Sequence, residues 1–320
     1  MKYLVTGGSG FIGSHLVDAL LEAGHEVVVL DNLSSGMLGN LVQVRDRINF
    51  IEGDIRDPEI CVQASAGCDG IFHEAALVSV ADSVERPREN HEINITGTLN
   101  VLEAARINGV KRVVFASSAA VYGDNPELPK HEEMLPEPKS PYAVAKMAGE
   151  NYLKSYGELY GLECVALRYF NVYGPRQDSS SPYSGVISIF SSRVQQGLPI
   201  TFFGDGEQTR DFVNVKDVVS ANILTMMSAN IFSNVQSPMS SAFAAFNVAT
   251  GKSHSLVQLL DTLEEISGTQ GERRFVDERT GDIRHSAADN ARLLSQGWLP
   301  AVELRQGLQT LENQRSSRTL

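Results

Sequence analysis

Short apolar runs alternate with amphipathic segments through the first half of the chain. Runs rich in Val, Ile and Phe, bounded by Gly, Asp or Asn, predict buried strands at residues 3–6, 26–30, 48–53, 70–75 and 112–117. Helical spacing of apolar positions predicts helices at residues 12–23, 57–66, 90–108 and 141–160. Strands that are apolar throughout and alternate with helices indicate a parallel sheet covered on both faces.

The pattern loosens after about residue 175. We expect a sixth strand at 164–174, a helix at 186–197, a turn, strand and helix within 204–218, and a strand, turn and helix within 246–268. The polar segment 228–242 is expected to be a surface loop, and the tail is expected to fray. The sequence thus predicts an α/β protein with a doubly wound parallel sheet in residues 1–175, which takes in returning elements from the C-terminal half, and a smaller α/β part in residues 176–320.

Composition and charge narrow the classes of function. The 320 residues carry a formal net charge of −12, which provides no basic surface for nucleic acid or an acidic membrane. The three cysteines form no CxxC and have no histidine at metal-ligand spacing, so we expect no metal site. The chain opens on a strand and contains no apolar run of 18 residues, so we expect a cytoplasmic protein without a membrane span.

A glycine-rich loop joins the first strand to the first helix. "TGGSGFIGSHL" places Gly7, Gly10 and Gly13 where the backbone can approach a pyrophosphate at a helix N-terminus. Asp31 lies 18 residues after Gly13, where a carboxylate accepts from both ribose hydroxyls and repels a 2′-phosphate. This context predicts a Rossmann-type NAD site. The neighbouring cofactor-binding candidates are Phe11, Ile12 and Asn32; the alternative for Asp31 is a turn residue.

Two further stretches belong to this prediction. Asp54 is expected to meet the adenine amino group and Ile55 to cover the ring, the alternative for Asp54 being a helix N-cap. Tyr142 and Lys146, in "SPYAVAK", share one helix face, with Ser140 as cap and Pro141 in the first turn. A nearby ammonium favours a phenolate, so this pair can supply a general base near neutral pH.

Taken together, the motifs resemble the extended short-chain dehydrogenase/reductases, and among them the NAD-dependent nucleotide-sugar epimerases. The resemblance covers nearly the whole chain and includes "HEAALVSV", "NITGTLNVLEAA", "FASSAAVYGDN", "RYFNVYGPRQ" and "GDGEQTRDFVNVKDV". It implies that Ser118, Tyr142 and Lys146 are the catalytic triad, and that C4 of the sugar is oxidised to a ketone and then reduced from the other face. It further implies roles at the cofactor for Ala75, Asn94 (supporting the lysine), Ser117 (beside the nicotinamide), Tyr169 and Val172.

The two residues after Ser118 bear on the reaction. By resemblance, sugar-nucleotide 4,6-dehydratases carry Asp and Glu there, and UDP-glucuronate decarboxylases keep a Glu just before the Val-Tyr pair. This chain has Ala119 and Ala120, which cannot transfer a proton. The sequence therefore favours epimerisation over dehydration, decarboxylation or simple reduction. A dinucleotide-binding sensor without activity would be expected to lack part of the triad, which is complete here.

The resemblance also implies a UDP-sugar substrate held by the C-terminal part. The expected phosphate and ribose contacts are Asn171, Arg210, Arg279 and Asp282; surface ion pairs are the alternative for the two arginines. Ser286 stands where UDP-glucose-restricted epimerases often carry Tyr, and Val78 where they commonly carry Lys, so UDP-N-acetylhexosamines are expected to fit. The alternative for Ser286 is a helix cap. A uronate epimerase, the rival reading, would need Arg284 or His285 to point inward. The resemblance also implies a homodimer formed through the two long helices, 90–108 and 141–160.

Overall fold

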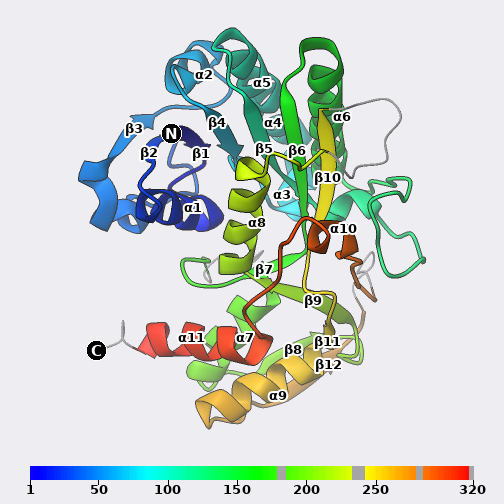
Figure 1. Cartoon of the computed structure of the whole chain (residues 1–320). Helices are drawn as coiled ribbons and strands as arrows, with labels where there is room; N and C mark the ends of the chain where they lie inside the picture. Colours follow the sequence, from blue (N-terminus) through cyan, green and yellow to red (C-terminus); the bar gives the residue numbers. More distant parts are fainter. Residues whose placement is uncertain (179–184, 233–241, 279–283, 317–320) are drawn as a thin grey trace. The chain divides into compact units, whose positions relative to one another are not determined.

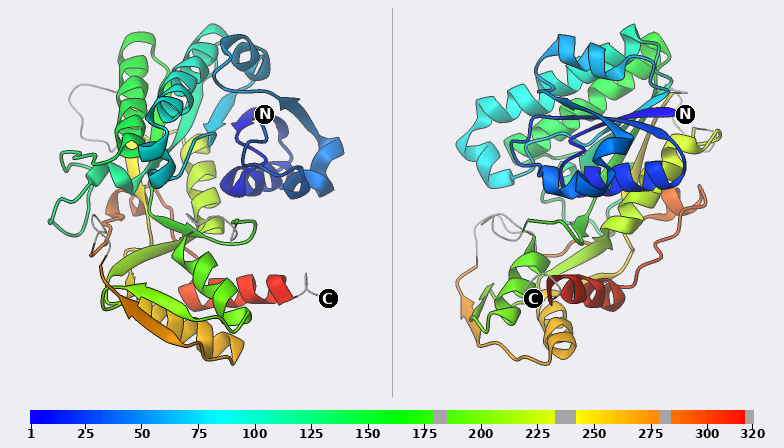
Figure 2. Two further views of the ribbon diagram at one scale, coloured as in Figure 1. Left: turned by 180° about the vertical axis from the view of Figure 1, so that it is seen from behind. Right: turned by 90° about the vertical axis from the view of Figure 1, so that its left-hand side faces the viewer.

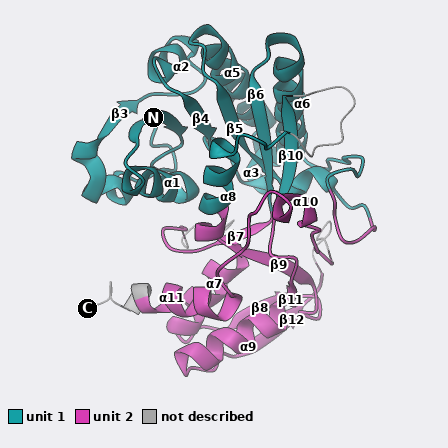
Figure 3. Ribbon diagram, viewed as in Figure 1, with its two compact units in different colours: residues 1–125, 132–169, 219–247 teal, residues 126–131, 170–218, 248–320 magenta. Residues whose placement is uncertain are grey.

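The computed structural model describes residues 1–178, 185–232, 242–278 and 284–316 (Figure 1). Two compact units divide the chain (Figure 3). Unit 1 comprises residues 1–125, 132–169 and 219–247, and unit 2 comprises residues 126–131, 170–218 and 248–320. The chain therefore leaves unit 1 after Tyr169 and returns to it for residues 219–247.

Within the described residues, unit 1 is built on a seven-stranded sheet with the order β10-β6-β5-β4-β1-β2-β3. Its strands are β1 (Lys2–Thr6), β2 (Glu26–Asp31), β3 (Ile48–Glu52), β4 (Gly70–His73), β5 (Arg112–Ser118), β6 (Glu163–Tyr169) and β10 (Phe243–Val248). All pairings from β3 to β6 are parallel. The strand order reverses direction between β1 and β4, and in open α/β sheets ligands bind at such a switch point.

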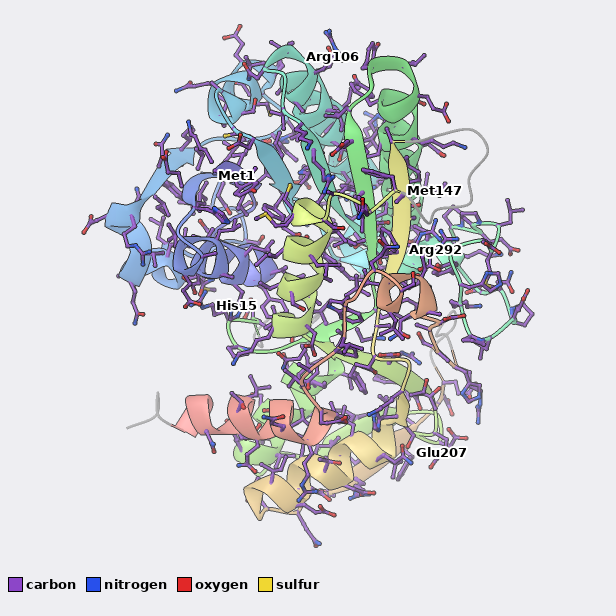
Figure 4. The ribbon with its side chains drawn as sticks, in the orientation of Figure 1. Met1, His15, Arg106, Met147, Glu207 and Arg292 are labelled. Carbon is purple, nitrogen blue, oxygen red and sulfur yellow. The ribbon has the colours of Figure 1, made fainter. Side chains whose placement is uncertain are left out.

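Helices cover both faces of this sheet (Figure 2). One face carries α2 (Pro58–Ser65), α5 (Gly97–Ile107) and α6 (Pro141–Tyr160), and the other carries α1 (Phe11–Glu22) and α8 (Val215–Met227). Side chains fill the space between the layers (Figure 4), and the core includes Val101, Phe115 and Leu153, each almost fully buried. Burial on both faces explains why these strands are apolar at nearly every position. No helix of the described residues is long and apolar enough to cross a membrane.

Unit 2 contains two small sheets and its own core. Strand β9 (Thr209–Asn214) lies between β7 (Asn171–Tyr173) and β11 (Ser253–Ser255), and β8 (Ile200–Phe203) pairs with β12 (Arg273–Val276). Its helices are α7 (Val186–Gln195), α9 (Leu256–Ser267), α10 (Ala291–Leu294) and α11 (Leu304–Ser316). Phe190, Phe202 and Leu260 belong to a buried apolar cluster between these elements.

Apart from the helix at 90–108, the strands and helices expected in the first half are confirmed, with small shifts at their ends. Two expectations need correction. The single strand at 164–174 is two strands, β6 and β7, which belong to different sheets. The helix at 90–108 is α4 (Pro87–His91), a π-helical turn at Glu92–Thr96, and α5. Helix α3 (Val80–Glu85) and 3₁₀ segment η1 (Leu38–Arg47) were not expected. Helix α3 has only six residues, and η1, as a 3₁₀ segment, lacks the apolar spacing of an α-helix. Most of the expected loop at 228–242 lies outside the described residues.

Candidate active site

The backbone of the glycine loop packs too tightly to admit side chains at Gly7 and Gly13. Gly7 has a φ of +68°, and a Cβ atom on Gly13 would lie 2.2 Å from the Gly7 carbonyl oxygen. Helix α1 begins directly after Gly10, and no side chain caps it. The hydroxyl of Ser9 is buried and has no hydrogen-bond partner among the described residues. Bare backbone at an uncapped helix N-terminus is the arrangement that receives a pyrophosphate.

The acidic candidates lie at the ends of β2 and β3. Asp31 is buried, and its carboxylate accepts from the backbone N–H of Ser9 and of Leu33, both at 2.8 Å. Asp54 accepts from the Arg56 guanidinium and, at 2.7 Å, from Asn32 Nδ2. The side-chain bonds from Arg56 hold the pKa of Asp54 at about 2, so this carboxylate is ionised. The helix-cap alternative for Asp54 is wrong, because Asp57 caps α2 instead.

The remaining cofactor candidates of unit 1 are also described. Ile55 is buried and packs where Gly97 of α5 leaves room. The backbone of Ala75 adjoins Gly7 in the glycine loop. Asn94 lies in the π-helical turn and is bonded to Leu77 and Asn90, so its described bonds do not lead to Lys146. Such π-helical turns are rare within helices and occur frequently at functional sites.

Helix α6 carries the candidate base and its cation, and neighbouring elements hold its first turn. Ser140 caps the helix by accepting from Ala143 N–H at 3.2 Å, and Pro141 follows, both as expected. The Tyr142 N–H donates to Ser83 Oγ of α3 at 3.1 Å. Asn90 of α4 donates to the Pro141 carbonyl. These contacts hold in place the helical turn that carries Tyr142.

The structure brings Ser118, Tyr142 and Lys146 together within unit 1. Ser118 ends β5 and forms a hydrogen bond with the Tyr142 hydroxyl. The Lys146 Nζ donates to the Ala116 carbonyl at 2.8 Å and lies 5.7 Å from the centre of the Tyr142 ring. Burial raises the pKa of Tyr142 and lowers the pKa of Lys146 to about 8. Lys146 is thus a cation below about pH 8, placed to favour a Tyr142 phenolate.

Residues 3–234 match the family model described as the NAD dependent epimerase/dehydratase family. The chain belongs to this family.

Similarity to individual members of the family extends over the whole chain. The UDP-glucose 4-epimerase of Mycolicibacterium smegmatis is 42% identical over 313 residues, 96% of each chain. A crystal structure of the Thermotoga maritima UDP-glucose 4-epimerase with UDP-glucose is 40% identical and covers 100% of both chains, with a TM-score of 0.92. The UDP-N-acetylglucosamine 4-epimerase of Methanobrevibacter ruminantium, solved with UDP-N-acetylmuramic acid, is also 40% identical, with a TM-score of 0.92 and coverage of 99% and 98%.

As a member of this family, the chain uses NAD as its cofactor. The residues present fit that cofactor. The glycine loop leaves backbone and the Ser9 hydroxyl available for phosphate oxygens, and Asp31 places a carboxylate at the end of β2, where a ribose lies in Rossmann folds. Among the described residues, no cluster of His, Cys, Asp and Glu could hold a metal ion.

The nucleotide-binding candidates and Ser286 lie in unit 2, and those that are described lie in or beside β9. Val78, the other candidate for sugar selection, lies in unit 1 and is exposed. Arg210 lies in β9, and its guanidinium donates to the Thr209 carbonyl at 2.8 Å. Asn171 of the adjacent strand β7 donates to the Asp211 carbonyl. Ser286 donates its N–H to the Thr209 carbonyl at 3.1 Å. Three residues far apart in sequence are thus attached to one strand. Val172 lies in β7, while Arg279 and Asp282 lie outside the described residues.

Two alternatives for this region are not supported by the geometry. Ser286 does not cap a helix, because α10 begins at Ala291 and follows Asn290. Arg284 is exposed and forms ion pairs with Asp205 at 2.6 Å and Glu278 at 3.1 Å. His285 Nδ1 lies 3.2 Å from Thr209 Oγ1. Arg284 is therefore engaged by two carboxylates, which weakens its candidacy as a partner for a uronate.

Sequence reasoning missed a buried network under the serine-bearing end of β5. Glu150 of α6 pairs with Arg168 of β6 through two hydrogen bonds, at 2.7 and 3.0 Å. The Ser117 hydroxyl donates to Glu150, so this side chain is committed to the network, although it was expected beside the nicotinamide. Arg168 also donates to the Tyr122 hydroxyl at 3.0 Å. The available signal was a charged residue, Arg168, inside an otherwise apolar strand.

Proposed function

We propose that this chain is an NAD-dependent 4-epimerase that interconverts UDP-N-acetylglucosamine and UDP-N-acetylgalactosamine, and also UDP-glucose and UDP-galactose. The arrangement of Ser118, Tyr142 and Lys146 carries the proposal, because these groups can orient and deprotonate one hydroxyl group while its carbon is reversibly oxidised. The residues that follow Ser118 are Ala119 and Ala120, in a 3₁₀ turn. They offer no acid–base group for eliminating water or carbon dioxide.

The roles of the three side chains follow from their contacts. Tyr142 removes the proton from the 4′-hydroxyl and returns it to the opposite epimer. Ser118 is bonded to Tyr142 and orients the reacting oxygen. Lys146 stays fixed against the Ala116 carbonyl and stabilises the phenolate. NAD, when bound, supplies the reversible oxidation of the alcohol and a positive charge beside the phenolate. In unit 2, Asn171, Arg210, Arg279 and Asp282 are proposed to hold the nucleotide diphosphate.

A single side chain supports the choice of sugar. The Thermotoga and Methanobrevibacter neighbours are equally similar to this chain, so overall similarity does not separate plain from N-acetylated hexoses. Ser286 is partly buried and anchored to β9 by its backbone. By resemblance, a bulky aromatic at this position closes the pocket against a C2 acetamido group. A serine leaves that volume open, and Val78 likewise departs from the lysine of galactose epimerases.

The test is a side-by-side assay of UDP-glucose, UDP-N-acetylglucosamine and UDP-glucuronate with the wild type and Ser286→Tyr. We expect turnover of the first two by the wild type. Ser286→Tyr should lower kcat/KM for the N-acetylated sugar at least about tenfold more than for UDP-glucose. The reason is that the tyrosine ring would clash with the C2 acetamido group, which UDP-glucose lacks. Ser295→Tyr, at an exposed position of unit 2, is the matched control. Equal losses on both sugars would contradict the role of Ser286 in selecting the sugar. Turnover of UDP-glucuronate alone would contradict the proposed substrates.

A further inference from the structure

Glu74 is a partly buried acid that the proposed mechanism does not use. It follows β4 directly, and its N–H donates to the Thr6 carbonyl of β1 at 3.2 Å. The next residue, Ala75, adjoins the glycine loop. Glu74 therefore lies at the switch point of the sheet, beside the cofactor candidates.

The carboxyl of Glu74 is held by a chain of hydrogen bonds. Asn222 Nδ2 of α8 donates to the Tyr169 hydroxyl at 2.7 Å, and that hydroxyl donates to Glu74 Oε1 at 2.8 Å. Tyr169 ends β6 and is the register partner of Ser118 in β5. Because β5 lies between β4 and β6, the Glu74–Tyr169 bond passes the end of β5, where Ser118 stands.

Geometry places the proposed catalytic pair beside Glu74. Glu74 follows His73, the register partner of Phe115, and Lys146 Nζ is bonded to the carbonyl of Ala116, the residue after Phe115. Tyr169 and Lys146 act to lower the pKa of Glu74, and Glu74 in turn raises the pKa of Tyr142. The neighbouring His73 is bonded between Thr6 and Thr98, and burial lowers its pKa to about 3, so it stays neutral. The protein packed around Glu74 raises the pKa of its carboxyl to about 7, against the opposing effects of Tyr169 and Lys146.

We propose that Glu74 is a positioning residue that controls the catalytic pair through its charge, with Tyr169 and Asn222 holding its carboxyl in place. An ionised Glu74 favours the ammonium of Lys146 and disfavours the phenolate of Tyr142. Because the pKa of the Glu74 carboxyl is about 7, Glu74 carries a negative charge above that pH and is neutral below it. The inference rests on the proposed function only in taking Tyr142 as the general base.

Removal of the negative charge has two opposing effects: it acts directly to lower the pKa of Tyr142, and it lowers the pKa of Lys146, whose ammonium favours the phenolate. The direct effect sets the expected sign, because Lys146 already loses its proton near pH 8, below the raised pKa of Tyr142, so the pKa of Tyr142 falls. Since the base works as the phenolate, the ascending limb of activity against pH moves with it. A nearby negative charge raises the pKa of an acid by about 1 unit or more, so its removal is expected to lower the pKa of Tyr142 by about 1 unit.

The experiment compares wild type with Glu74→Gln, whose amide keeps an acceptor for Tyr169, and with Glu74→Leu, which also removes the charge. Glu22→Gln, an exposed position on α1, is the matched control. One measurement is the pH profile of kcat/KM on the best substrate of the sugar panel. The other is the phenolate absorbance of the NAD-loaded protein against pH, with the Tyr142→Phe spectrum subtracted to isolate Tyr142. The second measurement needs no turnover.

A downward shift of the Tyr142 midpoint in either charge-neutral variant that folds, with no shift in Glu22→Gln, supports the proposal. An unchanged midpoint in a folded Glu74 variant overturns it, as does an equal shift in the control. If no sugar is turned over, the proposed function fails, while the absorbance titration still decides the role of Glu74. A loss of thermal stability without a shift in the midpoint assigns Glu74 a structural role only.

Discussion

Tyr142 depends on its surroundings for its chemistry. Burial raises the pKa of its phenol, and the hydrogen bond with Ser118 acts to lower it. Lys146, buried and bonded to the Ala116 carbonyl, lies 5.7 Å from the centre of the Tyr142 ring. At the scale of one residue, the hydroxyl of Tyr142 is the proposed general base.

Removing this hydroxyl tests the assignment. We expect Tyr142→Phe to lower kcat by about 10²–10⁴-fold, the usual contribution of a general acid–base group. NAD should stay bound, as measured by the cofactor content of the purified protein, because the glycine loop and Asp31 are untouched. Tyr160→Phe, the same change at the exposed end of α6, should leave activity near that of the wild type. Near-normal activity of Tyr142→Phe would refute the base assignment.

At the scale of elements, the end of β5 rests on α6 and β6 through a buried ion pair. The side chains of Glu150 and Arg168 are 3% and 5% exposed, so neither charge is compensated by water. Burial alone would lower the pKa of Arg168, but the bonds from Glu150 raise it. The pair thus connects α6 with β6 and, through Ser117, with the end of β5.

Breaking this pair should be costly. Arg168→Met leaves the Glu150 carboxylate buried without its partner, and we expect the free energy of unfolding to fall by about 3–5 kcal/mol. The double variant Glu150→Leu/Arg168→Met should recover part of this loss, because no charge remains buried. Urea denaturation measures both. Arg274→Met breaks an exposed pair with Glu272 and should have little effect. Equal effects of Arg168→Met and Arg274→Met would show that burial does not matter here.

At the scale of the whole molecule, we propose a homodimer. Helices α5 and α6 expose apolar side chains, among them Ile107, Val144 and Leu159. Pairing of these helices with their copies in a second chain would cover this apolar surface.

Light scattering after size exclusion should therefore give about twice the 34.8 kDa chain mass. Leu159→Arg should shift the mass toward that of one chain, because a charge would be buried in the interface. Leu299→Arg, which is equally exposed at 72%, is the control. A single-chain mass for the wild type at micromolar concentration would contradict the dimer.

The sequence predicted the elements better than their partners. Periodicity located β1 to β5, α1 and α6, because each buries a face of regular spacing. It could not show that residues 164–174 divide between two sheets, because β6 and β7 share an apolar composition and are separated only by Phe170. It did not assign β10 to the large sheet, since that pairing joins segments about 80 residues apart.

The residues of the candidate site divide in the same way, into those that the sequence predicted and those whose contacts only the structure revealed. The order of residues alone determined the glycine loop, Asp31, and the Tyr142–Lys146 pair, because a β-turn-α unit and an i, i+4 spacing fix those neighbours locally. Only the tertiary structure decided that Glu150 pairs with Arg168, that Glu74 reaches Tyr169, and that Arg210, Asn171 and Ser286 are attached to one strand. These contacts join elements distant in sequence, and no local spacing encodes which strand lies beside which.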